Sequence, residues 1–257
     1  MTVSPLVLKL ARGTPLTKED CEVLEAMGLD ATWTGPRLDL IREGEQPEYV
    51  HIVLEGFACR YKVLADGGRQ IIALLLPGDF CDLHVAILGE MDHTIATITA
   101  CKIARLPYST VTDITTNHPR ITRAMWWATL VDEGILREWL VGMGRRPADK
   151  RLAHFVCELM VRLQTVNLAT DSGFGLPLTQ SDLGDVLGLT LVHVNRVLQQ
   201  LRADGLLGLK EKQLIVADLP RLKVFAEFDP NYLHLQPRHE PSRLLKFSSY
   251  RVPKEQP

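Results

Sequence analysis

The chain has 257 residues, 46% of them hydrophobic and 23% charged, with a formal net charge of −2. These values are typical of a globular protein of one or two domains. No apolar run approaches the ~18–20 residues that span a bilayer, and the N-terminal apolar run is too short for a secretory signal. The five cysteines are scattered without a C-x-x-C pair, which is typical of a reduced, cytoplasmic setting.

The first half of the chain changes from helical to β-rich character. Residues 17–27 predict a short helix capped by Thr17, with Asp20 three residues further on. From about Leu38 to Pro107, short β-rich runs are separated by glycine-bearing turns at residues 43–44, 55–56, 66–68 and 77–78. Turns at intervals of ~8–12 residues predict a sandwich or barrel.

Residues 118–144 predict one long helix, with Pro119 in its first turn. One side of this helix carries residues at a spacing near 3.5, as in a coiled-coil seam. This stripe consists of Ile121, Met125, Ala128, Asp132, Ile135 and Trp139. We expect it to form a dimer interface, while Trp126, Trp127 and Leu130 face the β-domain; the alternative is a helix that only covers its own β-domain.

A glycine- and arginine-containing break before Pro147 marks the boundary to a second domain. A helix with a regular apolar face follows it, and residues 167–176 read as a loop. The predicted organisation is a sensor domain over 1–117, a dimerisation helix over 118–144, a DNA-binding domain over 145–228 and a tail over 229–257.

Two short helices with a glycine between them follow the loop. Thr179 is placed to cap the first helix, with Asp182 completing a capping box, and Gly188 is placed to end it. Thr190 is placed to cap the second helix, whose buried stripe is Val194, Val197, Leu198 and Leu201. Because residues 206–216 then predict a small hairpin, the pattern indicates a winged helix-turn-helix.

The side of the second helix opposite its buried stripe carries the residues expected to contact DNA. Arg196 can bond O6 and N7 of guanine together, and Asn195 can do the same with adenine. Lysines in the hairpin suit phosphates, which set position rather than sequence. The predicted DNA-contacting residues are Thr179, Gln180, Ser181, Thr190, Leu191, Val192, His193, Asn195, Arg196, Gln199, Lys210 and Lys212.

Taken in this order, the motifs resemble the Crp/Fnr family of bacterial transcription regulators over nearly the whole chain. The β-rich segment with its turns and the string LLLPGDF resembles the family's β-roll, and Thr190 followed six residues later by Arg196 resembles its recognition helix. The resemblance implies an α+β chain: an N-terminal cyclic-nucleotide-binding-type β-roll (jelly roll), a long dimerisation helix and a C-terminal winged helix-turn-helix. It implies a homodimer on a pseudo-palindromic double-stranded DNA operator, with RNA polymerase as a further partner if the protein is an activator.

Two positions depart from the family pattern. Many members carry a cytosine-reading Glu two residues after the helix-opening Thr, where this chain has Val192. Valine can contact a thymine methyl but cannot accept a hydrogen bond from cytosine, so the operator should differ from the usual one. Met91 and Asp92 stand where cyclic-AMP-binding members carry Arg-Ser, so we do not expect cyclic AMP to be the effector.

The effector is therefore expected to be an unidentified small molecule or redox signal. The candidate pocket residues are Asp79, Cys81, His84, Met91, Asp92 and His93. Cys81 and His84 have the chemistry of haem ligands, but a half-buried cysteine and surface histidines are the favoured interpretation. Only Cys21 lies in the region that carries clustered iron–sulfur ligands in some members, so no metal or other cofactor is predicted.

The sequence also leaves two other functional classes open. A cupin-like metal-dependent enzyme would need a His-x-His motif in the β-segment, which is absent there. A β-roll scaffold protein would explain the long helix but not the wing or the Arg196 face. The tail carries basic residues that could contact DNA or a partner, although a solvated tail is favoured; they are Arg238, Arg243, Lys246, Arg251 and Lys254.

Overall fold

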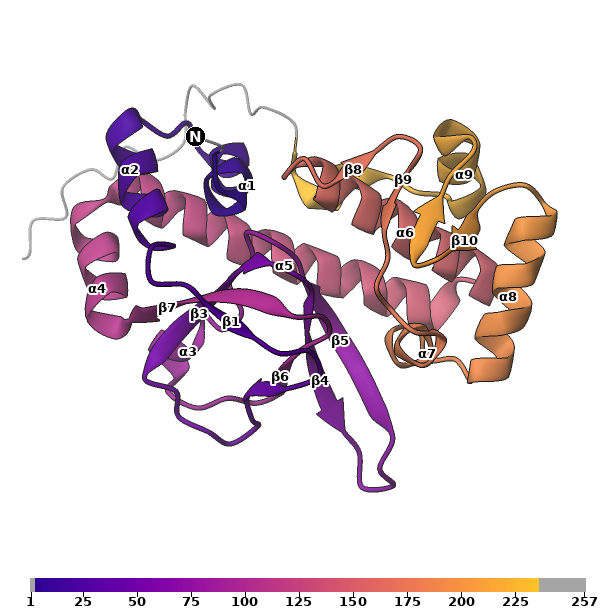
Figure 1. Ribbon diagram of the computed structural model, residues 1–257, viewed down its shortest axis with the longest axis horizontal. Coiled ribbons are helices and arrows are strands. Elements are labelled where there is room, and N and C mark those ends of the chain that lie inside the picture. The colour runs from indigo at the N-terminus through magenta and orange to yellow at the C-terminus, as the bar shows by residue number, and fades with distance from the viewer. Residues whose placement is uncertain (1–2, 236–257) are drawn as a thin grey trace, which may run out of the picture.

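The computed structural model describes residues 3–235, to which every statement below refers (Figure 1). Two N-terminal helices come first, α1 (Pro5–Gly13) and α2 (Lys18–Ala26). The capping box predicted for α2 is confirmed, with Thr17 and Asp20 bonded reciprocally. Helix α1 was not predicted; Ser4 caps it, Pro5 occupies its first turn, and it buries Leu6 and Leu10.

The predicted β-roll is present as two antiparallel sheets. One has the order β1-β7-β3 and the other β2-β6-β4-β5. Their bounds are β1 Thr32–Thr34, β2 Asp39–Ile41, β3 Tyr49–Glu55, β4 Ala58–Val63, β5 Arg69–Leu75, β6 Thr94–Thr97 and β7 Cys101–Pro107, with the short helix α3 (Val85–Leu88) between β5 and β6. Apolar side chains from both sheets, including Val53, Ile95 and Ile103, form a buried cluster that fixes the roll.

Helix α4 (Tyr108–Asn117) leads into α5 (Pro119–Arg145), which runs along the β-roll and on to the C-terminal domain (Figure 1). The stripe predicted to contact a partner lies largely inside the protomer, because Ile121, Met125, Ala128 and Ile135 are buried. Part of its cover is α1, which packs against α5. The prediction that this stripe forms the dimer interface is therefore wrong. The exposed side chains of α5 lie on another side of the helix.

The C-terminal domain is built on α6 (Ala148–Gln164), which buries the predicted apolar face and Cys157. It continues with α7 (Gln180–Leu187), α8 (Leu191–Ala203) and α9 (Leu219–Ala226), and a four-stranded sheet of order β10-β11-β9-β8. The strands are β8 Ala169–Thr170, β9 Gly173–Gly175, β10 Gly208–Lys210 and β11 Gln213–Ile215.

Part of the segment predicted to be a loop is a hairpin, β8 and β9, that extends the wing sheet. Gly173 makes this close pairing possible, because a Cβ there would lie 2.0 Å from the carbonyl oxygen of Leu214 and its φ is +147°. These strands are too short to show the alternating pattern by which a β-strand is recognised in a sequence.

The short 3-10 helix η1 (Pro230–Leu233) packs against α5 and buries Tyr232 and Leu233. The first residues of the predicted tail are thus part of the packed protein. The basic residues from Arg238 onwards lie outside the described part of the chain. Among residues 3–235, no helix is both long and apolar enough to cross a membrane.

Candidate nucleic-acid interface and effector pocket

Helix α7 begins and ends as the sequence predicts. The backbone N–H of Thr179 donates to Asp182 Oδ2 (2.8 Å), and the backbone N–H of Asp182 donates to Thr179 Oγ1 (3.1 Å). Gly188, with φ +63°, ends the helix in the left-handed conformation that glycine tolerates best. The turn from α7 into α8 is therefore encoded by local residues.

Helix α8 is held in place by its buried side. The backbone N–H of His193 donates to Thr190 Oγ1 (3.3 Å), so Thr190 caps the helix as predicted. Val194, Val197 and Leu201 are buried, and Leu198 is half-buried. Packing of this stripe fixes the rotation of α8 and so determines which residues face outward.

Helix α8 lies at the edge of the molecule, away from the β-roll (Figure 1). Val192 is 78% exposed, and Leu191 is also exposed. Arg196 and Gln199 are exposed, whereas His193 and Asn195 are half-buried. Among the described residues no carboxylate pairs with Arg196, so its guanidinium retains its five N–H donors for a ligand.

The remaining predicted contacts surround this face. Thr179 and Ser181 are exposed and Gln180 is half-buried at the start of α7. Lys210 and Lys212 are exposed in the wing, next to a turn in which Glu211 and Lys212 both have positive φ (53° and 63°). The structure thus brings basic and polar side chains from α7, α8 and the wing to the surface of one domain.

Two arginines of the β-roll bind the first helix of the helix-turn-helix, a contact that the sequence did not indicate. Arg37 donates from Nη1 and Nη2 to the two oxygens of Asp182 (2.6 Å each), and Arg69 Nη2 donates to Asp182 Oδ1 (2.9 Å). Arg69 Nε also donates to Asp185 (2.7 Å). Burial opposes the charge of Asp182, but hydrogen bonds from Arg37 and Thr179 hold its pKa well below its ordinary value.

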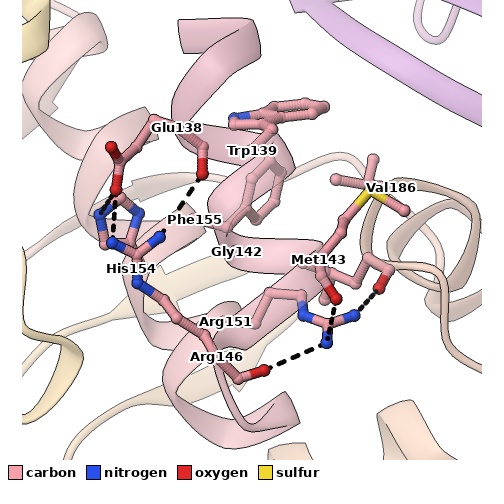
Figure 2. Close-up of a pocket in the computed structure, with 10 residues that line it drawn as sticks. Glu138, Trp139, Gly142, Met143, Arg146, Arg151, His154, Phe155 and Val186 are labelled. Atoms are coloured by element: carbon pink, nitrogen blue, oxygen red, sulfur yellow. Dashed lines mark hydrogen bonds and ion pairs between the residues drawn. The ribbon is translucent and has the colours of Figure 1, made fainter.

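A second junction joins α5, α6 and α7 (Figure 2). The Arg151 guanidinium donates to the carbonyl oxygens of Leu187 (2.6 Å), Arg146 (3.1 Å) and Met143 (3.3 Å). Arg146 turns back to pair with Glu138, and His154 lies beside the same carboxylate. The bend between the long helix and the DNA-binding domain is therefore held by side chains from both sides.

A buried chain of charges also crosses between the domains. Arg162 of α6 donates to Asp79 of the β-roll (2.9 Å) and to Glu158 (3.3 Å), while Lys9 of α1 pairs with Asp79 (2.5 Å). Burial opposes ionisation of Asp79, but Lys9 and Arg162 hold its pKa below its ordinary value. Burial raises the pKa of Glu158, which accepts hydrogen bonds from Trp139 and Tyr232.

The structure separates the six predicted effector-pocket residues into two groups. Cys81 and Met91 belong to the apolar cluster inside the roll, and Asp79 is occupied by Lys9 and Arg162. His84, Asp92 and His93 line a cavity of about 510 Å³ between the β-roll and α5. The prediction that Asp79, Cys81 and Met91 line this pocket was therefore wrong. An alternating strand-and-turn pattern does not show which side chains point inward.

Arg60 and Asp132 also line this cavity, although no sequence pattern marks them as pocket residues. Arg60 donates to the carbonyl oxygens of Cys81 (2.9 Å) and Phe80 (3.1 Å) and lies 3.4 Å from Asp132 on α5. Burial raises the pKa of Cys81 well above its ordinary value, so its side chain is a neutral thiol inside the apolar cluster. The pocket thus combines histidines, carboxylates and two engaged arginines, Arg60 and Arg162.

Both halves of the chain match models of known protein families. A cyclic nucleotide-binding domain model matches residues 38–118, and a Crp-like helix-turn-helix domain model matches residues 150–225. The transcriptional activator protein FnrL of Cereibacter sphaeroides is 31% identical over 188 residues, which are 71% of this chain and 75% of that protein. The nitrogen fixation regulation protein FixK of Bradyrhizobium diazoefficiens is 30% identical over 68% of this chain and 72% of its own length. The structure of FixK2 from Bradyrhizobium japonicum superposes with a TM-score of 0.68 at 30% identity, covering 77% of this chain and 98% of that one.

Proposed function

The chain belongs to the Crp/Fnr family of DNA-binding transcription regulators, and from this premise we propose how it binds DNA and what controls it. It acts as a homodimer on a pseudo-palindromic operator, with α8 of each protomer in a major groove. The observation that carries this proposal is the exposed face of α8, where Arg196 has no carboxylate partner among the described residues.

Base readout is assigned to α8 and phosphate contact to its surroundings. Arg196 reads guanine, Asn195 adenine, and Val192 a thymine methyl. Thr179, Gln180 and Ser181 at the start of α7, with Lys210 and Lys212 in the wing, contact phosphates. Because Val192 cannot accept from cytosine, the operator departs at that position from the one read by glutamate-bearing members.

The exposed side of α5 supports dimerisation. Trp126, Leu130 and Leu140 are 69%, 56% and 72% exposed, and Glu133 and Arg137 lie between them. These positions follow one another at steps of four, three, four and three residues, which is the spacing of a coiled-coil seam. The same helix joins the β-roll to the DNA-binding domain, so the dimer seam and the transmission path coincide.

The β-roll cavity receives a signal other than a cyclic nucleotide. Arg60 already binds two carbonyl oxygens and lies next to Asp132, while Asp92 adds a further carboxylate to the wall. A cyclic phosphate would meet these charges without a free arginine to bind it in a bidentate manner. The relatives named as transcriptional activators support activation through RNA polymerase, in the cytoplasm where DNA is accessible.

Selection of DNA from a random library tests this proposal. The protein should enrich a pseudo-palindrome whose half-site centres lie about 10–10.5 base pairs apart or a multiple of that. Lack of any enriched sequence would contradict sequence-specific reading. Enrichment of a single unrepeated half-site would instead contradict the dimer while leaving base readout intact.

A further inference from the structure

We propose that His84, Asp92 and His93 form a binding site for a divalent transition metal ion, with zinc(II) as the reference ion. One nitrogen of each imidazole and one oxygen of the carboxylate all lie within 4.8 Å of one another. The biological role of this site rests on the proposed effector function of the cavity. The arrangement of its side chains does not depend on that function. It replaces the expectation from sequence that the protein holds no metal.

His93 supplies the evidence that a ligand is missing. Its side chain is buried, with 6% exposure, and its Nδ1 lies 2.5 Å from Asp92 Oδ1. Its Nε2 is buried with no hydrogen-bond partner among the described residues. Buried polar atoms in folded proteins nearly always have a partner, so an ion bound at Nε2 would supply one that the described residues do not.

The contact with Asp92 also selects a suitable tautomer. When Nδ1–H donates to the carboxylate, Nε2 carries the lone pair that a metal requires. Histidine ligands are commonly oriented in this way by a carboxylate on the second ring nitrogen. Asp92 binds the ring nitrogen on the side away from Nε2, so it orients His93 and does not itself coordinate the ion.

His84 completes the group from the other side. Its ring centroid lies 5.5 Å from that of His93, with the planes tilted by 36°. Both side chains line the cavity, and together they bring one nitrogen of each imidazole to the same place.

The ligand types and the surroundings define the class of ion. Two imidazoles, one of them oriented by a carboxylate, suit zinc(II) or iron(II), and the adjoining cavity leaves room for water or a small ligand in the remaining positions. The opposite wall is part of α5 and includes Asp132 and Glu133. Calcium and magnesium are not expected, because they prefer sites made of oxygen ligands alone.

Metal titration of the full-length protein, stripped with a chelator and dialysed, tests the site directly. Cobalt(II) should give visible d–d absorption that saturates at one ion per protomer, and zinc(II) should displace it. His84→Ala and His93→Ala should each weaken binding at least tenfold. His118→Ala, which alters a histidine outside the group, should leave the titration unchanged.

His93 is buried, so its replacement can disturb folding; His84 is half-buried and keeps the test decisive. Absence of cobalt absorption in the unaltered protein would overturn the proposal. So would equal affinity in His84→Ala and the unaltered protein, as measured by calorimetry with zinc(II). Because the readout involves no DNA, a negative result here leaves the operator selection to decide the regulator function separately.

Discussion

Arg37 and Asp182 connect the β-roll to the helix-turn-helix through two parallel hydrogen bonds, each 2.6 Å long. The same carboxylate caps α7 through Thr179, so a single buried side chain both starts the first helix of the motif and docks it against the sensor domain. A displacement of the β-roll that moves Arg37 would therefore act on the helix that precedes the recognition helix.

Replacement of Arg37 by Ala should destabilise the protein because it leaves the buried Asp182 carboxylate with fewer donors. We expect a loss of about 1–3 kcal/mol in the free energy of unfolding, measured by chemical denaturation. Arg42→Ala is the matched control, since Arg42 pairs with Asp39 at the surface and exposed pairs contribute at most ~1 kcal/mol. Equal losses in the two variants would show that the Arg37–Asp182 contact has no special role.

Leu130→Glu and Leu140→Glu should each convert a dimer to monomers, because dimerisation would bury the introduced carboxylates along the α5 seam. Sedimentation equilibrium should show the dimer dissociation constant rising more than tenfold, which corresponds to about 1.4 kcal/mol. Val224→Glu, at an exposed position of α9, is the control that should not change the constant. A monomeric unaltered protein, or dimers that persist in both α5 variants, would refute the seam.

Val192→Glu should change which base the protein prefers without a large change in stability, because the side chain is exposed. Glutamate can accept a hydrogen bond from N4 of cytosine, an interaction worth about 1–3 kcal/mol of discrimination. Selection from a random library should then enrich cytosine at one position of each half-site where the unaltered protein favours thymine. Identical selected sequences would place Val192 outside the readout.

His154 should make the protein less stable in mild acid. Burial and the nearby Arg146 together lower the pKa of His154 from 6.5 to about 4, although Glu138 opposes the shift. The unfolded chain binds a proton near pH 6.5, whereas the folded protein resists it until about pH 4. The contribution of His154 to stability is therefore complete above pH 6.5 and is lost as the pH falls towards 4.

His154→Phe should flatten this part of the stability profile, because phenylalanine does not titrate and can pack against Phe228 and Tyr232. Denaturation midpoints at several pH values between 4 and 7 provide the measurement, with His118→Phe as the control. A variant whose profile parallels that of the unaltered protein would show that another group causes the acid sensitivity.

Local features of the helix-turn-helix could be predicted from sequence because they depend on neighbouring residues. Thr179, Asp182, Gly188 and Thr190 each act within one helical turn of the backbone groups that they satisfy. The buried stripe of α8 likewise follows from helical periodicity alone. The fold class was also accessible, since turn spacing and the ordered set of motifs agreed.

Contacts between distant segments could not be predicted in the same way. Both sides of α5 carry residues at coiled-coil spacing, and only the packing of α1 and the β-roll decides which side remains exposed. Arg37 and Asp182 are 145 positions apart in the chain, and no local pattern links them. Asp79, Cys81 and Met91 were wrongly predicted to line the pocket for the same reason, because the side chains that they contact come from other elements.

The most direct test of DNA reading compares Arg196→Ala with Lys210→Ala on the selected operator and on random DNA over a range of salt concentrations. Arg196→Ala should weaken operator binding by about 1–3 kcal/mol, relax one base position and leave random DNA nearly unaffected. Lys210→Ala should weaken both DNAs similarly and reduce the salt slope by about one. Equal losses on operator and random DNA for Arg196→Ala would contradict the central claim that this face of α8 reads sequence.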